Sequence, residues 1–130
     1  MKKAIILSLS LLLFFGCKTN TKQFNKSPET AEKGKQLFTN LGCIACHSIT
    51  GEKLYGPSLN NILNKKVEVV RNGELLLITV DKEYLTKSIQ DPEYEKVSSL
   101  KSHKMPKPEI SAEDINYLVE YIISVNSTRN

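Results

Sequence analysis

The sequence contains few residues of the kinds that bind metals, with three cysteines and two histidines among its 130 residues. Two of the cysteines and one histidine lie together between Cys43 and His47, so only Cys17 and His103 remain to complete a metal site. A structural zinc site takes four ligands in a tetrahedron, and this scattered set is a poor match. The sequence therefore argues against a zinc-binding protein.

Long hydrophobic runs are also missing. The apolar stretch over 4–15 follows the basic head Met1-Lys2-Lys3 and is interrupted by Ser8 and Ser10. As a helix, this stretch covers only ~18 Å at ~1.5 Å per residue, which is short of the ~30 Å hydrocarbon core of a bilayer. Residues 1–16 are therefore predicted to be a secretory signal peptide, which places the mature protein in the cell envelope on the periplasmic side.

A strong charge of one sign is lacking as well. The formal net charge is +4, but removal of the signal peptide takes Lys2 and Lys3 away and leaves sixteen basic and fourteen acidic residues. A nearly neutral protein of this kind has no electrostatic preference for nucleic acid. No Ser/His/Asp or paired-carboxylate arrangement stands out in the sequence either. We expect neither a nucleic-acid partner nor an enzyme that uses such groups.

What the sequence does contain is the run Cys43-Ile44-Ala45-Cys46-His47. On a helical turn the two sulfur atoms lie close enough to reach both vinyl groups of one porphyrin, and the adjacent imidazole comes beneath the iron. A thioredoxin-like redox pair would need a βαβ context, whereas the flanking residues have helical spacing with no strand before the motif. The spacing therefore predicts one haem c, attached covalently through Cys43 and Cys46.

Helix start signals predict an all-α domain over residues 28–126. Residues 17–27 are polar and without periodicity, which favours a flexible tether, and residues 127–130 are expected to form a short tail. Candidate N-caps at Ser27, Asp81 and Ser111 predict three main helices. These helices are expected over 28–40, over 82–90, and from 112 through at least 123, with a shorter helical turn over 59–63.

Residues 67–80 differ from the rest of the domain. Val67-Glu68-Val69 alternates, Asn72-Gly73 is a strong hairpin turn signal, and residues 75–80 are apolar and partly β-branched. The sequence predicts a small β-hairpin inserted in the helical domain. Two roles are open for it: a cover over one edge of the haem and the core, or a docking surface.

Several motifs together resemble the class I cytochrome c family, the small helical single-haem electron carriers, over about residues 31–125. They are Gly34-Lys35-Gln36-Leu37-Phe38, Gly42 to Ser48, Gly56-Pro57-Ser58-Leu59, Met105-Pro106 and Leu118-Val119-Glu120-Tyr121-Ile122. The stretch from Asp81 to Met105-Pro106 is most similar to cytochrome c domains fused to subunit II of some haem-copper oxidases. No copper-site segment accompanies it here, so the chain resembles the carrier domain alone.

The resemblance implies a role for individual residues. Cys43 and Cys46 would be the thioether attachment points and His47 the proximal iron ligand, with the Pro57 carbonyl accepting a hydrogen bond from His47 Nδ1 and so fixing the imidazole. Gly34 and Phe38 would pack against Leu118 and Tyr121. The residues implied to line an apolar haem pocket are Leu59, Leu63, Leu85 and Ile89.

The end of the signal peptide, Phe14-Phe15-Gly16-Cys17, resembles the lipobox of bacterial lipoproteins. The resemblance implies that Cys17 is lipidated and becomes the new N-terminus. The two acyl chains of a diacylglycerol suffice for stable anchoring, where a single chain would be marginal. The other interpretation is an ordinary exported protein in which Cys17 is free or disulfide-linked.

Met105 is the preferred distal ligand, because Met1 leaves with the signal peptide and Pro106 would stiffen the loop that presents the thioether. Met/His coordination raises the reduction potential. His103 is the rival ligand and would give a bis-His haem of lower potential. The nearby lysines, Lys101, Lys104 and Lys107 with Lys65 and Lys66, are either solvated or steer an acidic partner.

The predicted function is that of an exported, membrane-tethered monohaem cytochrome c, which carries single electrons between respiratory redox proteins such as an oxidase, a reductase or a dehydrogenase. With both axial positions filled, there is no open position for a substrate, so we expect a carrier and not an enzyme. Two alternatives remain. One is a haem-based sensing module whose Met105 dissociates to admit a ligand, and the other is a fixed subunit of an oxidase or reductase complex.

Overall fold

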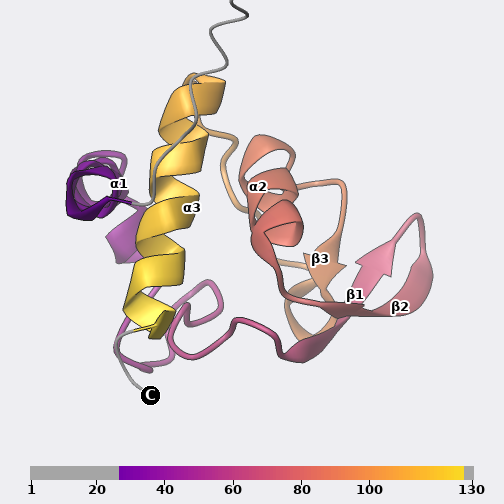
Figure 1. The fold of residues 1–130 in the computed structure, drawn as a ribbon. Helices are drawn as coiled ribbons and strands as arrows, with labels where there is room; N and C mark the ends of the chain where they lie inside the picture. Colours follow the sequence, from indigo (N-terminus) through magenta and orange to yellow (C-terminus); the bar gives the residue numbers. More distant parts are fainter. Residues whose placement is uncertain (1–26, 128–130) are drawn as a thin grey trace, which may run out of the picture.

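Three α-helices and a small antiparallel sheet make up residues 27–127, which are the residues that this computed structural model describes (Figure 1). The helices are α1 (Pro28–Asn40), α2 (Lys82–Gln90) and α3 (Ala112–Ser127), and the strands are β1 (Lys66–Arg71), β2 (Glu74–Thr79) and β3 (Lys96–Val97). Two short 3-10 turns, η1 (Cys43–Ala45) and η2 (Ser98–Leu100), complete the set. The predicted signal peptide, Cys17, most of the tether and the last three residues of the tail lie outside the described residues.

All three main helices begin at the predicted caps. The Ser27 side chain accepts a hydrogen bond from the Thr30 N–H at 3.2 Å, and Asp81 accepts one from the Tyr84 N–H at 2.8 Å. At the start of α3, the Asp114 N–H donates to Ser111 Oγ at 3.1 Å, and the Ser111 N–H donates to the Asp114 carboxylate at 3.3 Å. This reciprocal pair is a capping box with Asp in place of Glu.

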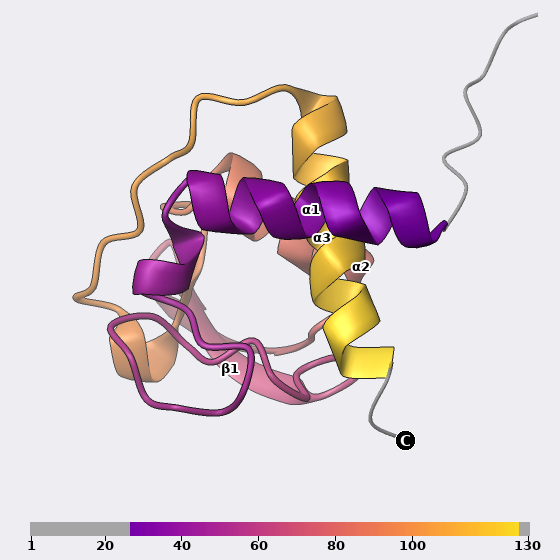
Figure 2. The same cartoon turned by 90° about the vertical axis from the view of Figure 1, so that its left-hand side faces the viewer.

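The first and last helices cross in close contact, as Figure 2 shows. Gly34 lies at the crossing, where an added Cβ would stand 2.0 Å from the Tyr117 carbonyl oxygen and 2.6 Å from Tyr121 Cβ. One turn further along α1, the rings of Phe38 and Tyr121 lie 5.5 Å apart in a tilted arrangement. The predicted packing of Gly34 and Phe38 against the C-terminal helix is therefore confirmed, and it requires a glycine at the crossing.

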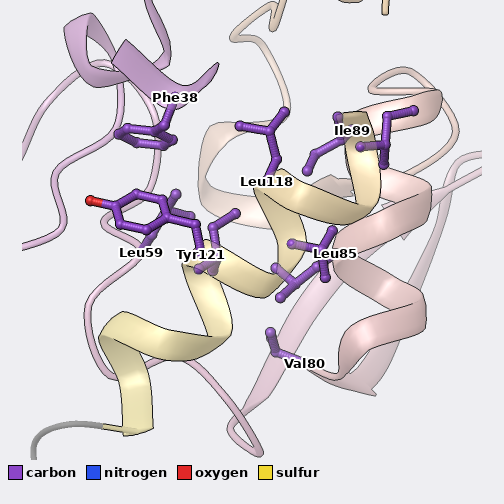
Figure 3. Packing of buried hydrophobic residues seen from close by; sticks show 10 residues of the cluster. Phe38, Leu59, Val80, Leu85, Ile89, Leu118 and Tyr121 are labelled. Carbon is purple, nitrogen blue, oxygen red and sulfur yellow. The ribbon is translucent and has the colours of Figure 1, made fainter. Parts of the chain in front are cut away.

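A single apolar cluster joins the three helices (Figure 3). α3 supplies the centre of the cluster, α1 contributes Phe38 from one side, and α2 contributes Leu85 and Ile89 from the other. Leu59 and Val80 reach the same cluster from outside the helices. Residues from the three helices and from two connecting segments thus share one interior.

The predicted hairpin is present, but it belongs to a three-stranded sheet of order β2-β1-β3. Asn72 and Gly73 both have positive φ, 52° and 84°, as a two-residue type I′ turn requires. The third strand was not predicted, because Lys96–Val97 is too short to show a pattern. β1 pairs with β3 through Val69 and Val97, and β2 forms the opposite edge. The domain is therefore mostly helical, with a small sheet in addition to the expected helices.

The helical turn expected over residues 59–63 is wrong. Asn61 and Asn64 both adopt positive φ, 55° and 62°, which a right-handed helix does not allow. The segment is instead fixed from outside, since Asn126 of α3 accepts from the Ile62 N–H at 2.7 Å and donates to the Leu59 carbonyl at 3.0 Å. Hydrogen bonds from the Asn126 side chain thus take the place of the backbone bonds that a local helix would make.

Candidate functional site

The cysteine–histidine motif forms a tight turn directly after α1. Gly42 begins it with a left-handed φ of 75°, and the next residues form the 3-10 turn η1. The N–H groups of Cys46 and His47 both donate to the Cys43 carbonyl, at 3.1 and 2.9 Å. These two hydrogen bonds close the turn, so Cys43, Cys46 and His47 are held close together.

Cys43 and Cys46 are half-buried and neither is in a disulfide within the described residues. Cys43 packs against the central apolar cluster, and this burial raises the pKa of its thiol. The Cys43 side chain thus lies where the protein surface meets its apolar interior. That position suits a group whose flat apolar ring enters the core while one edge is bonded to the chain.

Ser48 organises the loop that follows the motif. Its side-chain oxygen is buried and accepts hydrogen bonds from the N–H groups of Thr50, Gly51 and Glu52, at 3.1, 3.1 and 3.2 Å. The hydroxyls of Ser48 and Thr50 in turn donate to the Glu52 carboxylate. These two donors lower the pKa of Glu52 to about 2, because they stabilise its charged form.

The same loop folds back onto the motif through backbone bonds. The Gly56 N–H donates to the Cys46 carbonyl at 2.8 Å, and the Leu59 N–H donates to the Ser48 carbonyl at 2.7 Å. Gly56 then lies directly on the imidazole, since a Cβ at this position would be 2.5 Å from His47 Cε1. The two backbone bonds and the missing side chain together bring Pro57 beside the histidine.

The Pro57 carbonyl oxygen lies 2.9 Å from His47 Nδ1, which is the contact that the family resemblance implies. A carbonyl only accepts hydrogen bonds, so Nδ1 must carry the proton. In the neutral ring, Nε2 is then unprotonated and offers its lone pair to a metal. The fold therefore fixes the tautomer that an iron ligand requires, without assigning a ligand on the opposite side.

The residues implied to line the pocket are brought together. Leu59, Leu85 and Ile89 belong to the central cluster, and Leu63 packs against it from a partly buried position. Cys43 packs against this same cluster. An apolar interior beside a free cysteine pair and an oriented imidazole suits the apolar ring, the vinyl groups and the iron of a haem, so the residues fit this group.

Met105 lies in the long connection between η2 and α3 and is partly buried. His103, two residues earlier, is engaged with Tyr55: its Nδ1 lies 2.7 Å from the Tyr55 carbonyl oxygen, and the two rings stack at 4.3 Å with an interplanar angle of 11°. The Lys104 N–H also donates to the Tyr55 hydroxyl at 3.2 Å. The loop with Met105 is thus joined to the segment that carries Gly56 and Pro57.

The contacts of three residues of the site were not predicted from the sequence. Gly56 had a visible signal in the Gly-Pro pair, although its contact with the His47 ring was not foreseen. Asn126 is a polar residue near the end of an apolar helix, where it ties the segment after Leu59 to α3. Tyr55 gave no signal, because its partners are 48 and 49 residues away in the chain.

The turn, the oriented imidazole and the apolar cluster together define a protein that attaches a haem covalently. A comparison with protein-family models identifies the family within this class. The model described as Cytochrome c matches residues 31–126. The chain belongs to the cytochrome c family. A search of curated proteins finds no match.

Membership of this family settles the cofactor and the general activity. The family binds haem c covalently, and Cys43 and Cys46 with the following His47 have the spacing for it. The chain is a haem protein of electron transfer. Within residues 27–127, none of the helices is both long and apolar enough to cross a membrane.

Proposed function

We propose that this chain is an exported monohaem cytochrome c, held at a membrane by a lipid on Cys17, that passes single electrons between respiratory redox proteins on the periplasmic side of the cell envelope. The observation that carries the electron-transfer part of the proposal is the 2.9 Å contact between His47 Nδ1 and the Pro57 carbonyl oxygen, next to the cysteine pair. This contact presents Nε2 to a metal, and a second-shell bond of this kind makes the imidazole a stronger donor.

In this proposal, His47 and Met105 would hold the haem iron. The haem itself supplies reversible one-electron chemistry when it is bound. Pro57 holds the orientation of His47, while Leu59 and its neighbours in the apolar cluster exclude water. With both residues on the iron, no position would remain for a substrate, which favours a carrier over a catalyst.

Met105→Ala tests the distal ligand. We expect the holoprotein to lose the visible spectrum of a Met/His haem and to have a lower reduction potential, because the thioether favours the ferrous state. His103→Ala removes the rival ligand, and it is expected to keep a Met/His spectrum. If Met105→Ala left both spectrum and potential unchanged while His103→Ala altered them, His103 would be the ligand and the proposal would be wrong on this point.

Carbon monoxide separates a carrier from a sensing module. A carrier with a firm Met105 ligand is expected to bind carbon monoxide poorly in the reduced state at neutral pH, because the sixth position is occupied. Rapid and tight binding by the wild-type protein would favour the sensor. A fixed subunit has the same chemistry and would be recognised by its co-purification with an oxidase or reductase after mild detergent extraction.

The anchor is tested by the intact mass of the protein isolated from membranes. We expect a mass that corresponds to loss of residues 1–16, gain of one haem and acylation at Cys17. A Cys17→Ser variant should lose the acyl mass and leave the membrane, while its haem content stays the same. A membrane-bound, unacylated form would contradict the lipid anchor without affecting the haem assignment.

Electrostatic steering is the proposed route to the partner. Lys101, Lys104 and Lys107 are all exposed along the loop that contains Met105. If they guide an acidic partner, the association rate must fall steeply as ionic strength rises, since surface charges are screened over ~10 Å at 0.1 M salt. Exposed Lys35 on α1 is a control position, where charge removal should leave the rate unchanged.

A further inference from the structure

Tyr55 makes three separate contacts with the loop that carries Met105. Its carbonyl oxygen accepts from His103 Nδ1 at 2.7 Å, its ring stacks on the His103 ring at 4.3 Å, and its hydroxyl accepts from the Lys104 N–H at 3.2 Å. The direction of both hydrogen bonds is certain, because a carbonyl can only accept and a backbone N–H can only donate. Backbone and side chain of one residue thus hold two successive residues of the loop.

The loop has few other connections. Residues 101–110 contain no helix or strand, and their local backbone bonds run from Lys101 to Ser98 and from His103 to Leu100. Within the described residues, the hydrogen bonds that tie this loop to a distant part of the chain all end on Tyr55. Apolar packing of Ile110 against the central cluster fixes only its far end.

The position of Tyr55 links the two sides of the haem site. It precedes Gly56, whose backbone lies against the His47 ring, and it is two residues from the Pro57 carbonyl that orients the ring. His103, at the other end of the contact, is two residues from Met105. Figure 2 shows the segment after the cysteine turn and the segment around η2 on the same side of the molecule.

We propose that Tyr55 and His103 form a clasp that positions the Met105 loop on the segment that orients His47, and that the clasp sets how often the Met105 thioether leaves the iron. This inference rests on the proposed role of Met105 as distal ligand. Both clasp residues are positioning residues, because they act through Met105 and not on the iron. Opening the clasp frees the loop and makes the sixth position accessible to external ligands.

The expected effect follows from population-shift arithmetic. The apparent affinity of an external ligand is its intrinsic affinity multiplied by the fraction of molecules in which the position is open. If removal of the clasp raises the open fraction about tenfold, binding strengthens about tenfold. The reduction potential should fall in the same variants, because loss of the thioether removes a stabiliser of the ferrous state.

The experiment compares four single variants and one double variant, Tyr55→Ala/His103→Ala, of the full-length holoprotein with the wild type. Tyr55→Ala removes the stack and the hydroxyl contact, and His103→Ala removes the stack and the Nδ1 donor. Tyr55→Phe keeps the ring and the carbonyl. Leu54→Ala is the matched control, since Leu54 is an exposed neighbour with 44% relative accessibility.

Three measurements are made on each protein: imidazole binding to the ferric form, the reduction potential, and hydrogen exchange of residues 101–110. We expect imidazole to bind about tenfold more tightly to Tyr55→Ala and His103→Ala, with faster exchange and a lower potential. Tyr55→Phe should lie within about threefold of the wild type, and Leu54→Ala should match it. The double variant Tyr55→Ala/His103→Ala should exceed either single variant by less than the sum of the two effects, because the ring stack is the one contact that both substitutions remove.

Two results would overturn the clasp. One is wild-type imidazole affinity, potential and exchange in Tyr55→Ala. The other is a loss of the distal ligand in His103→Ala that Tyr55→Ala does not reproduce, which would make His103 itself the ligand.

Met105→Ala distinguishes the failure of the clasp from the failure of the proposed ligand. If Met105→Ala leaves the spectrum unchanged, Met105 is not the ligand and the clasp proposal fails with it. If Met105→Ala changes the spectrum and Tyr55→Ala does not, only the clasp fails.

Discussion

At the scale of single residues, Gly56 is the position where one added carbon should disturb the site most directly. In Gly56→Ala, the new Cβ would meet the His47 ring 2.5 Å from Cε1, so the ring or the loop must move. The bond between His47 and Pro57 would then weaken. We expect a lower yield of holoprotein and an altered potential in the fraction that matures, measured by haem content and redox titration.

Gly73→Ala is the matched control for this change. Gly73 has a φ of +84°, but no atom lies within 4 Å of an added Cβ. Alanine there costs about 1–2 kcal/mol of backbone strain in the hairpin turn. It should lower the stability of the protein while the haem spectrum and the potential stay unchanged. Equal effects of both substitutions on the potential would show that Gly56 acts only through general stability.

Glu52 is expected to give the loop after the motif a dependence on acid. Its pKa is about 2 in the folded protein, held down by the Ser48 and Thr50 hydroxyls, against ~4.3 in an unfolded chain. A carboxylate with a lowered folded pKa stabilises the fold above the unfolded pKa, and this contribution is lost as the pH falls from ~4.3 toward about 2.

Glu52→Gln should therefore be less stable than the wild type at pH 7, with a difference that narrows below pH 4. Denaturant midpoints of the two holoproteins across this pH range measure the effect. Glu109→Gln, in an exposed position outside this turn, provides the comparison. A difference that stayed constant from pH 7 to pH 2.5 would show that the Glu52 charge has no part in holding the loop.

At the scale of elements, the contact of α1 with α3 depends on Gly34. In an exposed helix, a change from glycine to alanine adds about 1 kcal/mol of stability. At the crossing the sign should reverse, because the Cβ of Gly34→Ala would stand 2.0 Å from the Tyr117 carbonyl oxygen. We expect a net loss of about 2 kcal/mol in denaturant unfolding of the holoprotein.

Gln36→Ala, on the exposed side of α1, is the control for helix propensity and should be neutral or slightly stabilising. If Gly34→Ala also proved stabilising, the two helices would have to be further apart than the structure places them.

The elements that the sequence predicted correctly are those whose signals are local. The caps at Ser27 and Asp81 and the turn at Asn72-Gly73 depend on neighbours within a few residues, and each is where the sequence placed it. The segment over residues 59–63 was predicted wrongly, because its conformation is decided by Asn126 on a distant helix. β3 was missed for a similar reason, since two residues pair with β1 only after the fold brings them together.

In the site too, features with local signals were predicted and contacts between distant residues were not. The spacing of the cysteine–histidine motif is read directly from the chain, and the family resemblance implied the Pro57 contact that the structure contains. No local pattern could indicate that Tyr55 meets His103, because these residues lie 48 positions apart and their contact depends on the path of two loops. Sequence patterns therefore located the haem attachment, while only the folded chain showed how the two loops are joined.

At the scale of the whole molecule, the fold should depend on its haem. The central cluster holds ten buried residues, so the protein alone provides a small core. Chains of about 100 residues bury a modest share of their surface and have little stability to spare. A covalent porphyrin would add apolar surface to the core and link Cys43 to Cys46, which restricts the unfolded chain.

The double variant Cys43→Ala/Cys46→Ala, which cannot form the thioethers, tests this dependence. Without attached haem, we expect the domain to expand from a radius of gyration of ~13 Å toward the ~30 Å of an unfolded chain and to lose its cooperative thermal transition. Small-angle scattering and circular dichroism of both proteins measure these changes. Met105→Ala is the control, because it keeps both thioethers and should stay compact. A haem-free double variant with the wild-type radius and a cooperative transition would contradict this expectation. It would show that the apolar cluster around α3 is sufficient for folding, and that the haem does not stabilise the fold.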